Sequence, residues 1–122
     1  MKVVILFPKD SKRIGRGFRE EVFEIPPKIL KGMLETYRRT KNVNRAVYEG
    51  CEWIAKTAAK RWCRSMGRPR DEACIDEYLS KQGERIIQQC EPAVRRWIAD
   101  VAECIKRCNR ERNCLEGCIK EL

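Results

Sequence analysis

Apolar positions follow two different spacings along the chain, and the change from one to the other marks the expected elements. Residues 1–7 are almost all apolar, which predicts a strand that is buried or that pairs with a partner. Residues 20–25 form a second short strand, because side chains on a strand alternate between two faces. One face would carry Glu21, Phe23 and Ile25, and the other would carry Glu20, Val22 and Glu24.

Beyond residue 26 the apolar positions recur at helical spacing. Pro26 ends the strand and Pro27 suits the first turn of a helix over about 27–39. A second helix begins at a cap, Asn42 or Asn44, and runs to about Ser65. Helices over about 71–90, 92–109 and 114–122 follow, the first capped by Asp71 and the second started or kinked by Pro92. The expected fold is mainly α with one or two short N-terminal strands.

Charge divides the chain into a basic first half and a nearly neutral second half. The formal net charge is +9, of which residues 1–70 carry +11 and residues 71–122 carry −2. The segment 9–19 contributes five cations around two glycines and reads as a basic arm. This asymmetry favours a module that faces a polyanion, joined to a support that does not, although ordinary solubility charge is the alternative.

The strand–helix–helix stretch carries a resemblance to a known family. Ile25-Pro26, the packed positions of the first helix, and Asn42-Val43-Asn44-Arg45-Ala46-Val47 resemble the ribbon-helix-helix DNA-binding fold of small prokaryotic repressors and antitoxins, of which MetJ and Arc are examples. The resemblance covers about 40 residues. It implies a homodimer or higher homo-oligomer whose paired strands read bases in double-stranded DNA, while the start of the second helix grips phosphate. Three segments follow: a strand and basic arm (1–19), this module (20–65) and a helical extension (66–122).

The DNA-binding residues expected from charge, helix position and this resemblance lie in the arm and at the start of the second helix: Lys9, Lys12, Arg13, Arg16, Arg19, Lys41, Asn42, Asn44 and Arg45. Free N–H groups and the positive dipole end of a helix favour phosphate at the latter site. The outward strand face argues against base reading, because Glu20 and Glu24 would repel phosphate and bases are mostly read by Arg, Lys, Asn or Gln.

Eight cysteines and no histidine make the chain unusual, and six of these cysteines lie in the extension. Cysteines four residues apart lie on one helix face, so two antiparallel helices would bring Cys104 opposite Cys118 and Cys108 opposite Cys114. This arrangement resembles twin Cys-x3-Cys hairpins. The other four nest about the turn at 67–69, which predicts Cys63–Cys74 and Cys51–Cys90. An iron–sulfur cluster on the last four, or free buried thiols, are the alternatives to disulfides, and no other metal site or cofactor is expected.

The remaining expectations concern what the protein is. No catalytic constellation is evident, and Trp53, Trp62 and Trp97 lie on helical stripes that predict core or interface. No apolar run is long enough for a membrane span, and the start is too short for a signal-peptide core. Disulfides without a secretion signal, together with a high charge density, suit a hyperthermophilic archaeon or its virus. The hypotheses are a cytoplasmic DNA-binding regulator, a protein that coats DNA in a nucleoid or virion, and an antitoxin-like interaction module.

Overall fold

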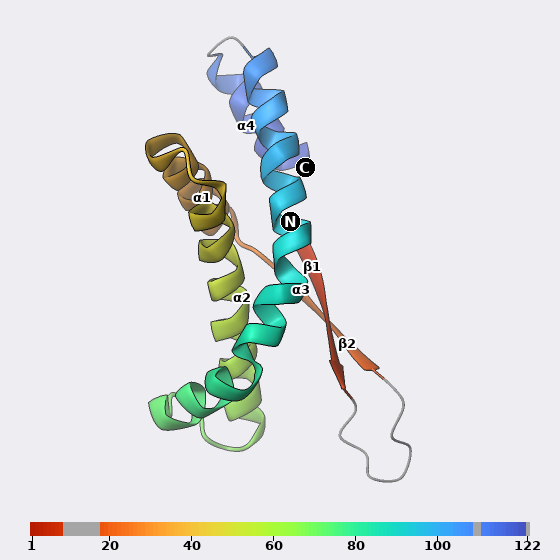
Figure 1. The fold of residues 1–122 in the computed structure, drawn as a ribbon, viewed down its shortest axis with the longest axis vertical. Coiled ribbons are helices and arrows are strands. Elements are labelled where there is room, and N and C mark those ends of the chain that lie inside the picture. The colour runs from red at the N-terminus through yellow and green to blue at the C-terminus, as the bar shows by residue number, and fades with distance from the viewer. Residues whose placement is uncertain (9–17, 109–110, 122) are drawn as a thin grey trace.

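The structure, a computed structural model, describes residues 1–8, 18–108 and 111–121. Within these ranges two strands precede four helices (Figure 1): β1 (Lys2–Pro8), β2 (Phe18–Glu24), α1 (Pro27–Thr40), α2 (Val43–Ser65), α3 (Glu72–Arg107) and α4 (Arg112–Glu121). The fold is therefore mainly helical with a short N-terminal sheet, as the sequence predicts. No helix in these ranges is both long enough and apolar enough to cross a membrane.

The two strands pair with each other, so β1 is the partner of β2 within the same chain. They run antiparallel, with Val4 opposite Val22 and Leu6 opposite Glu20. The inner face is buried, as alternation predicts: Val3, Ile5, Phe7, Phe23 and Ile25 expose 6% of their surface or less. The ribbon therefore forms without a strand from a second subunit.

Side chains from the helices occupy both outer edges of this sheet. The Gln89 amide of α3 accepts a hydrogen bond from the Leu6 N–H (2.8 Å) and donates one to the Leu6 carbonyl (2.9 Å), as a neighbouring strand would. On the opposite edge, the Arg61 guanidinium of α2 donates to the Val22 carbonyl (3.4 Å). Unpaired edge groups invite another chain to add a strand, so these contacts close the sheet at both positions.

The expected bounds of the first two helices are accurate to within a few residues, because the local signals are strong. Pro26 precedes α1 in an extended conformation and Pro27 occupies its first turn. Of the two candidate caps for α2, Asn42 is the one used: its side chain accepts a hydrogen bond from the Arg45 N–H at 3.3 Å. Asp71 caps α3 as expected, by accepting from the Cys74 N–H at 3.2 Å.

The break expected at Pro92 is wrong, because residues 72–107 form one helix with Pro92 inside it. A proline removes one helical hydrogen bond, which leaves the Gln88 carbonyl without its donor. Both residues are exposed, so water can bond that carbonyl. The opposite face of the same turns is buried through Cys90, Val94 and Trp97, and this packing holds the helix continuous.

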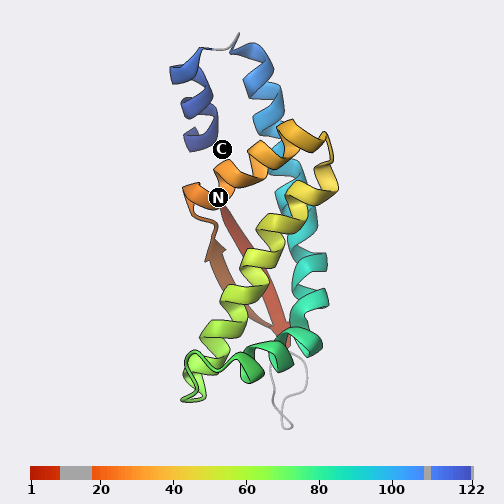
Figure 2. The same cartoon turned by 90° about the vertical axis from the view of Figure 1, so that its left-hand side faces the viewer.

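One hydrophobic core joins all three segments of the chain. It contains the inner face of the hairpin, the packed faces of α1 and α2, and residues of α3 that include Ile86, Ile98 and Val101. The four disulfide bonds are those that the sequence predicts: Cys51–Cys90, Cys63–Cys74, Cys104–Cys118 and Cys108–Cys114. The first two join α2 to α3, and the last two hold α4 to the end of α3. Figure 2 shows α2 as the diagonal element that spans the molecule from α1 to the far end of the hairpin.

Candidate nucleic-acid interface

The corner between α1 and α2 carries four of the expected DNA-binding residues. Helix α1 ends where Lys41 adopts a left-handed conformation (φ 57°) and donates its N–H to the Tyr37 carbonyl at 2.8 Å. Asn42 then caps α2, and Asn44 and Arg45 lie in its first turn. Lys41, Asn42, Asn44 and Arg45 are all exposed to solvent, so the structure brings this part of the predicted site together.

Polar contacts beneath the corner fix the angle between the two helices. Thr36, which is buried, donates its hydroxyl to a Glu49 carboxylate oxygen. The Thr40 hydroxyl donates to the Thr36 carbonyl at 2.7 Å and accepts from the Asn42 N–H at 3.2 Å. A chain of hydrogen bonds from α1 to α2 therefore holds the start of α2 in place and leaves its first turn facing outward.

Helix stability explains two of the four cations at this corner and not the other two. Arg38 and Arg39 lie in the last turn of α1, where cations stabilise a helix. Lys41 and Arg45 lie at the positive end of α2, where cations are unfavourable and anions are favoured. The first turn of α2 contains no acidic residue, and none of these four cations makes an ion pair within the described ranges. An anion bound at this corner would offset the unfavourable interaction of Lys41 and Arg45 with the positive end of α2.

The outward face of the hairpin offers little for reading bases. It presents Val4 (50% exposed), Leu6 (39%) and Val22 (51%), flanked by Lys2, Glu20 and Glu24. Only one of these six side chains is among the residue types that commonly contact base edges. The two carboxylates predicted for this face do lie on it, beside the apolar side chains.

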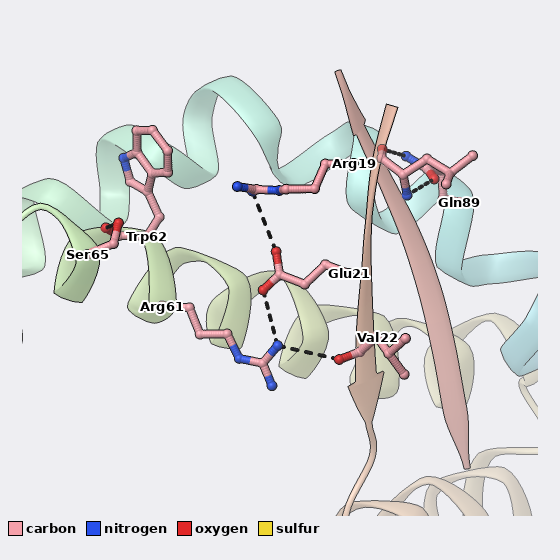
Figure 3. Close-up of polar contacts among 8 residues, drawn as sticks. Arg19, Glu21, Val22, Arg61, Trp62, Ser65 and Gln89 are labelled. Carbon is pink, nitrogen blue, oxygen red and sulfur yellow. Dashed lines mark hydrogen bonds and ion pairs between the residues drawn. The ribbon is translucent and has the colours of Figure 1, made fainter. Parts of the chain in front are cut away.

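At the far end of α2, charges from two elements meet. The Glu21 carboxylate of β2 pairs with Arg61 at 3.1 Å and with Arg19 at 3.7 Å (Figure 3). The Arg61 guanidinium also lies 4.5 Å from the centre of the Phe23 ring, which is a cation–π contact. This pairing anchors β2 on α2, and the Arg19 guanidinium lies 5.6 Å from the centre of the Phe7 ring of β1.

The predicted DNA-binding residues therefore fall in separate places. Lys9, Lys12, Arg13 and Arg16 lie outside the described residues. Arg19 lies at the far end of α2, near Arg61, whereas Arg45 lies in its first turn. Sixteen residues of α2, or about 24 Å, separate Arg45 from Arg61. A duplex that contacts both would have to run along the molecule.

A cleft at the far end of α2 was not predicted. Its volume is about 500 Å³, and its lining comes from the hairpin, the end of α2 and the start of α3. Trp62, expected in a core or interface, is 43% exposed here, and its ring centre lies 6.0 Å from that of Tyr78. Burial raises the pKa of the Tyr78 phenol above its ordinary value, and the Glu21 carboxylate raises it further. The Cys63–Cys74 bond was the available signal, because it places the residues that flank this turn side by side.

Among the residues that the structure describes, three C-terminal cysteines come closest to a metal site. The Sγ atoms of Cys104, Cys108 and Cys118 lie within 4.8 Å of one another. All three are in disulfide bonds in this structure, and a disulfide sulfur is not a thiolate ligand. The cluster could hold a metal only after reduction.

Comparison with known proteins gives no match: no protein-family model, no curated protein and no solved structure is similar to this chain. The order of β2, α1 and α2 agrees with the strand–helix–helix pattern of the ribbon-helix-helix family. That resemblance stays a prediction.

Proposed function

We propose that this protein binds double-stranded DNA through the phosphate backbone, without reading the base sequence. The observation that carries the proposal is the placement of Lys41 and Arg45 at the positive end of α2, without acidic neighbours in that turn. Two cations, the free N–H groups of the first turn and the helix dipole all favour a phosphate at this one point.

The net charge supports a polyanionic partner. The chain carries +9 in total, with the excess in its first 70 residues. Such a charge gives an affinity for DNA that depends on salt and not on sequence. The expected cations of the arm, Lys9, Lys12, Arg13 and Arg16, would add to this affinity. A role in coating DNA, in a nucleoid or a virion, follows from these properties.

The alternative is a ribbon-helix-helix regulator, which the order of β2, α1 and α2 favours. In that family two subunits pair their strands. Here β1 takes the position of the second strand, so a single chain would supply the whole ribbon. A regulator also needs side chains that distinguish bases, and the exposed face offers Lys2 beside Glu20 and Glu24. This face argues against base reading, and phosphate contacts would have to come from other parts of the molecule.

Binding to unrelated duplexes across a range of salt concentrations tests the proposal. We expect similar affinities for all sequences and a steep decrease with salt. The double variant Lys41→Gln/Arg45→Gln should lower the slope of log K against log salt by about 2, which is about one per phosphate contact. A matched control, Arg95→Gln/Arg96→Gln, removes the same charge from exposed positions on α3 and should lower the slope by less.

Two results would contradict the proposal. A preference of about 10³-fold or more for one duplex would indicate a sequence-specific regulator. Equal slopes for the two double variants would show that the α1–α2 corner does not contact phosphate. Sedimentation of the free protein would at the same time determine whether it is a homodimer.

A further inference from the structure

The cleft at the far end of α2 combines three kinds of side chain that one class of ligand requires together. Aromatic and cationic residues line it, and so does Gln82, whose buried side-chain oxygen has no hydrogen-bond partner among the described residues. The residues used below are Arg19, Trp62, Met66, Arg68, Lys81 and Gln82, all of which line the cleft.

The aromatic wall offers a flat surface to solvent. Trp62 is 43% exposed although it stands beside Tyr78, and Met66 is 60% exposed. Exposed aromatic side chains of this size in a cleft mark binding sites more often than isolated surface residues do. Figure 3 shows the Arg19 side chain extending from β2 toward Trp62 of α2. A planar ring placed on Trp62 would thus also lie near a guanidinium.

Gln82 supplies the polar atom. Its side-chain Oε1 is buried and has no hydrogen-bond donor among the described residues. A buried acceptor without a donor is unfavourable, because it has lost its bonds to water. The atom is closed off from solvent in this structure, so the Gln82 side chain would have to turn toward the cleft to accept from an N–H group of a ligand. The exocyclic amino groups of adenine, cytosine and guanine are such donors.

The cations around the cleft are available to an anion. Arg19, Arg68 and Lys81 pair with Glu21, Asp71 and Glu77 at 3.7, 3.1 and 3.0 Å. The side chains of these three cations are 60–68% exposed. Ion pairs this exposed contribute little to stability, so a phosphate group can compete with the carboxylates.

We propose that this cleft binds an unpaired base of single-stranded nucleic acid, with the base stacked on Trp62, its amino group donating to Gln82 and the adjoining phosphate held by Arg19 or Arg68. The inference rests on the proposed function in assuming that the partner is a nucleic acid. It adds a second site, about 24 Å along α2 from the phosphate site at the α1–α2 corner, and predicts that single strands are held by bases as well as by phosphates.

Three probes of equal length separate this site from backbone binding: a labelled single strand of mixed sequence, the same strand with abasic sites in place of its bases, and a duplex. We expect the full-length protein to bind the single strand at least about tenfold more tightly than the abasic strand, because stacking on an aromatic side chain contributes this much for one base. Tryptophan fluorescence should be quenched by the base-bearing strand alone.

Three variants localise the effect. Trp62→Leu should abolish the preference over the abasic strand and leave duplex binding unchanged. Tyr48→Leu is the matched control, because Tyr48 is 51% exposed on the same helix and lies outside the cleft; it should keep the preference. Thermal melting would show whether Trp62→Leu perturbs folding. Met66→Glu provides an independent test in that case: it places a negative charge at an exposed position in the cleft and should weaken single-strand binding.

The two proposals fail in different ways. Equal binding of the base-bearing and abasic strands would overturn the inference and leave backbone binding intact. The inference would also be overturned if Trp62→Leu folds and retains the preference. It would be overturned as well if an acidic, tyrosine-containing peptide, added as a fourth probe, quenches the tryptophan fluorescence and the nucleic acids do not. Binding of none of the three nucleic-acid probes at low salt would refute the proposed function itself.

Discussion

The Cys51–Cys90 bond allows a quantitative test of what holds the helices together. Both cysteines are fully buried, and the bond joins the middle of α2 to the middle of α3. The perturbation is the pair of substitutions Cys51→Ala/Cys90→Ala. Alanine suits the apolar surroundings and leaves no polar group buried in the core.

The magnitude follows from the length of chain that each bond closes. With a sequence separation of 39, the loss of cross-linking entropy in the unfolded chain is about 3.9 kcal/mol at 25 °C. The Cys63–Cys74 bond joins the same two helices with a separation of 11, which gives about 2.8 kcal/mol. Cys74 is only half-buried, so its removal also leaves a smaller cavity. Both effects predict that removal of the Cys51–Cys90 bond lowers the free energy of unfolding more than removal of the Cys63–Cys74 bond does.

Guanidinium chloride unfolding of the two double variants measures this difference. We expect Cys51→Ala/Cys90→Ala to lower the free energy of unfolding by about 1 kcal/mol more than Cys63→Ala/Cys74→Ala does. Far-UV circular dichroism would confirm that each variant folds before its stability is compared. An equal or smaller loss for the Cys51–Cys90 variant would refute the argument from loop length and burial.

Two further predictions follow from single residues. Replacing Gln89 by Leu should speed hydrogen exchange at the Leu6 amide, because its acceptor is lost; an unchanged rate in an exchange experiment would show that this contact does not close the sheet edge. The pKa of Tyr78 is raised by burial, so the unfolded chain releases its phenolic proton first as the pH rises. Stability should therefore fall above about pH 10 and up to the folded-state pKa, and Tyr78→Phe should make this fall shallower in unfolding curves measured at each pH. A slope that Tyr78→Phe does not change would refute this assignment.

Local signals made the helices and cross-links predictable. A proline pair, Asn42 and Asp71 set the starts of α1, α2 and α3, since caps act within one turn of chain. The disulfide pairing followed largely from helical geometry, because cysteines at similar distances from a turn meet when two helices fold back on each other. Cys51 and Cys90 lie farther out on the same hairpin, and the C-terminal pairs also resemble twin Cys-x3-Cys hairpins. The strand faces were equally clear, since Phe23 and Ile25 required burial.

The features that were not predicted depend on contacts between distant residues. Helical hydrogen bonding fails locally at Pro92, yet packing of Cys90 and Val94 on the opposite face holds the helix together. The pairing of β1 with β2 and the contact between Gln89 and Leu6 join residues far apart in sequence. The cleft needs α2, α3 and the hairpin in place before its walls exist. The periodicity of apolar residues assigned Trp62 to a packed stripe, because periodicity shows which face of a helix a residue lies on. It does not show whether a neighbouring element extends far enough to cover that residue.

The positions of the disulfide bonds divide the chain into a part that is covalently cross-linked and a part that is not. Every disulfide bond lies between Cys51 and Cys118, so the described residues of the hairpin and α1 are held against the other helices by noncovalent contacts, which include the Glu21–Arg61 ion pair. Under heat or denaturant, the hairpin and α1 can detach as a unit while the remaining helices stay tethered in a compact, partly ordered state. When the hairpin and α1 pack back, the cross-linked helices are already close to their native arrangement. They therefore provide a preformed surface on which the rest of the chain refolds.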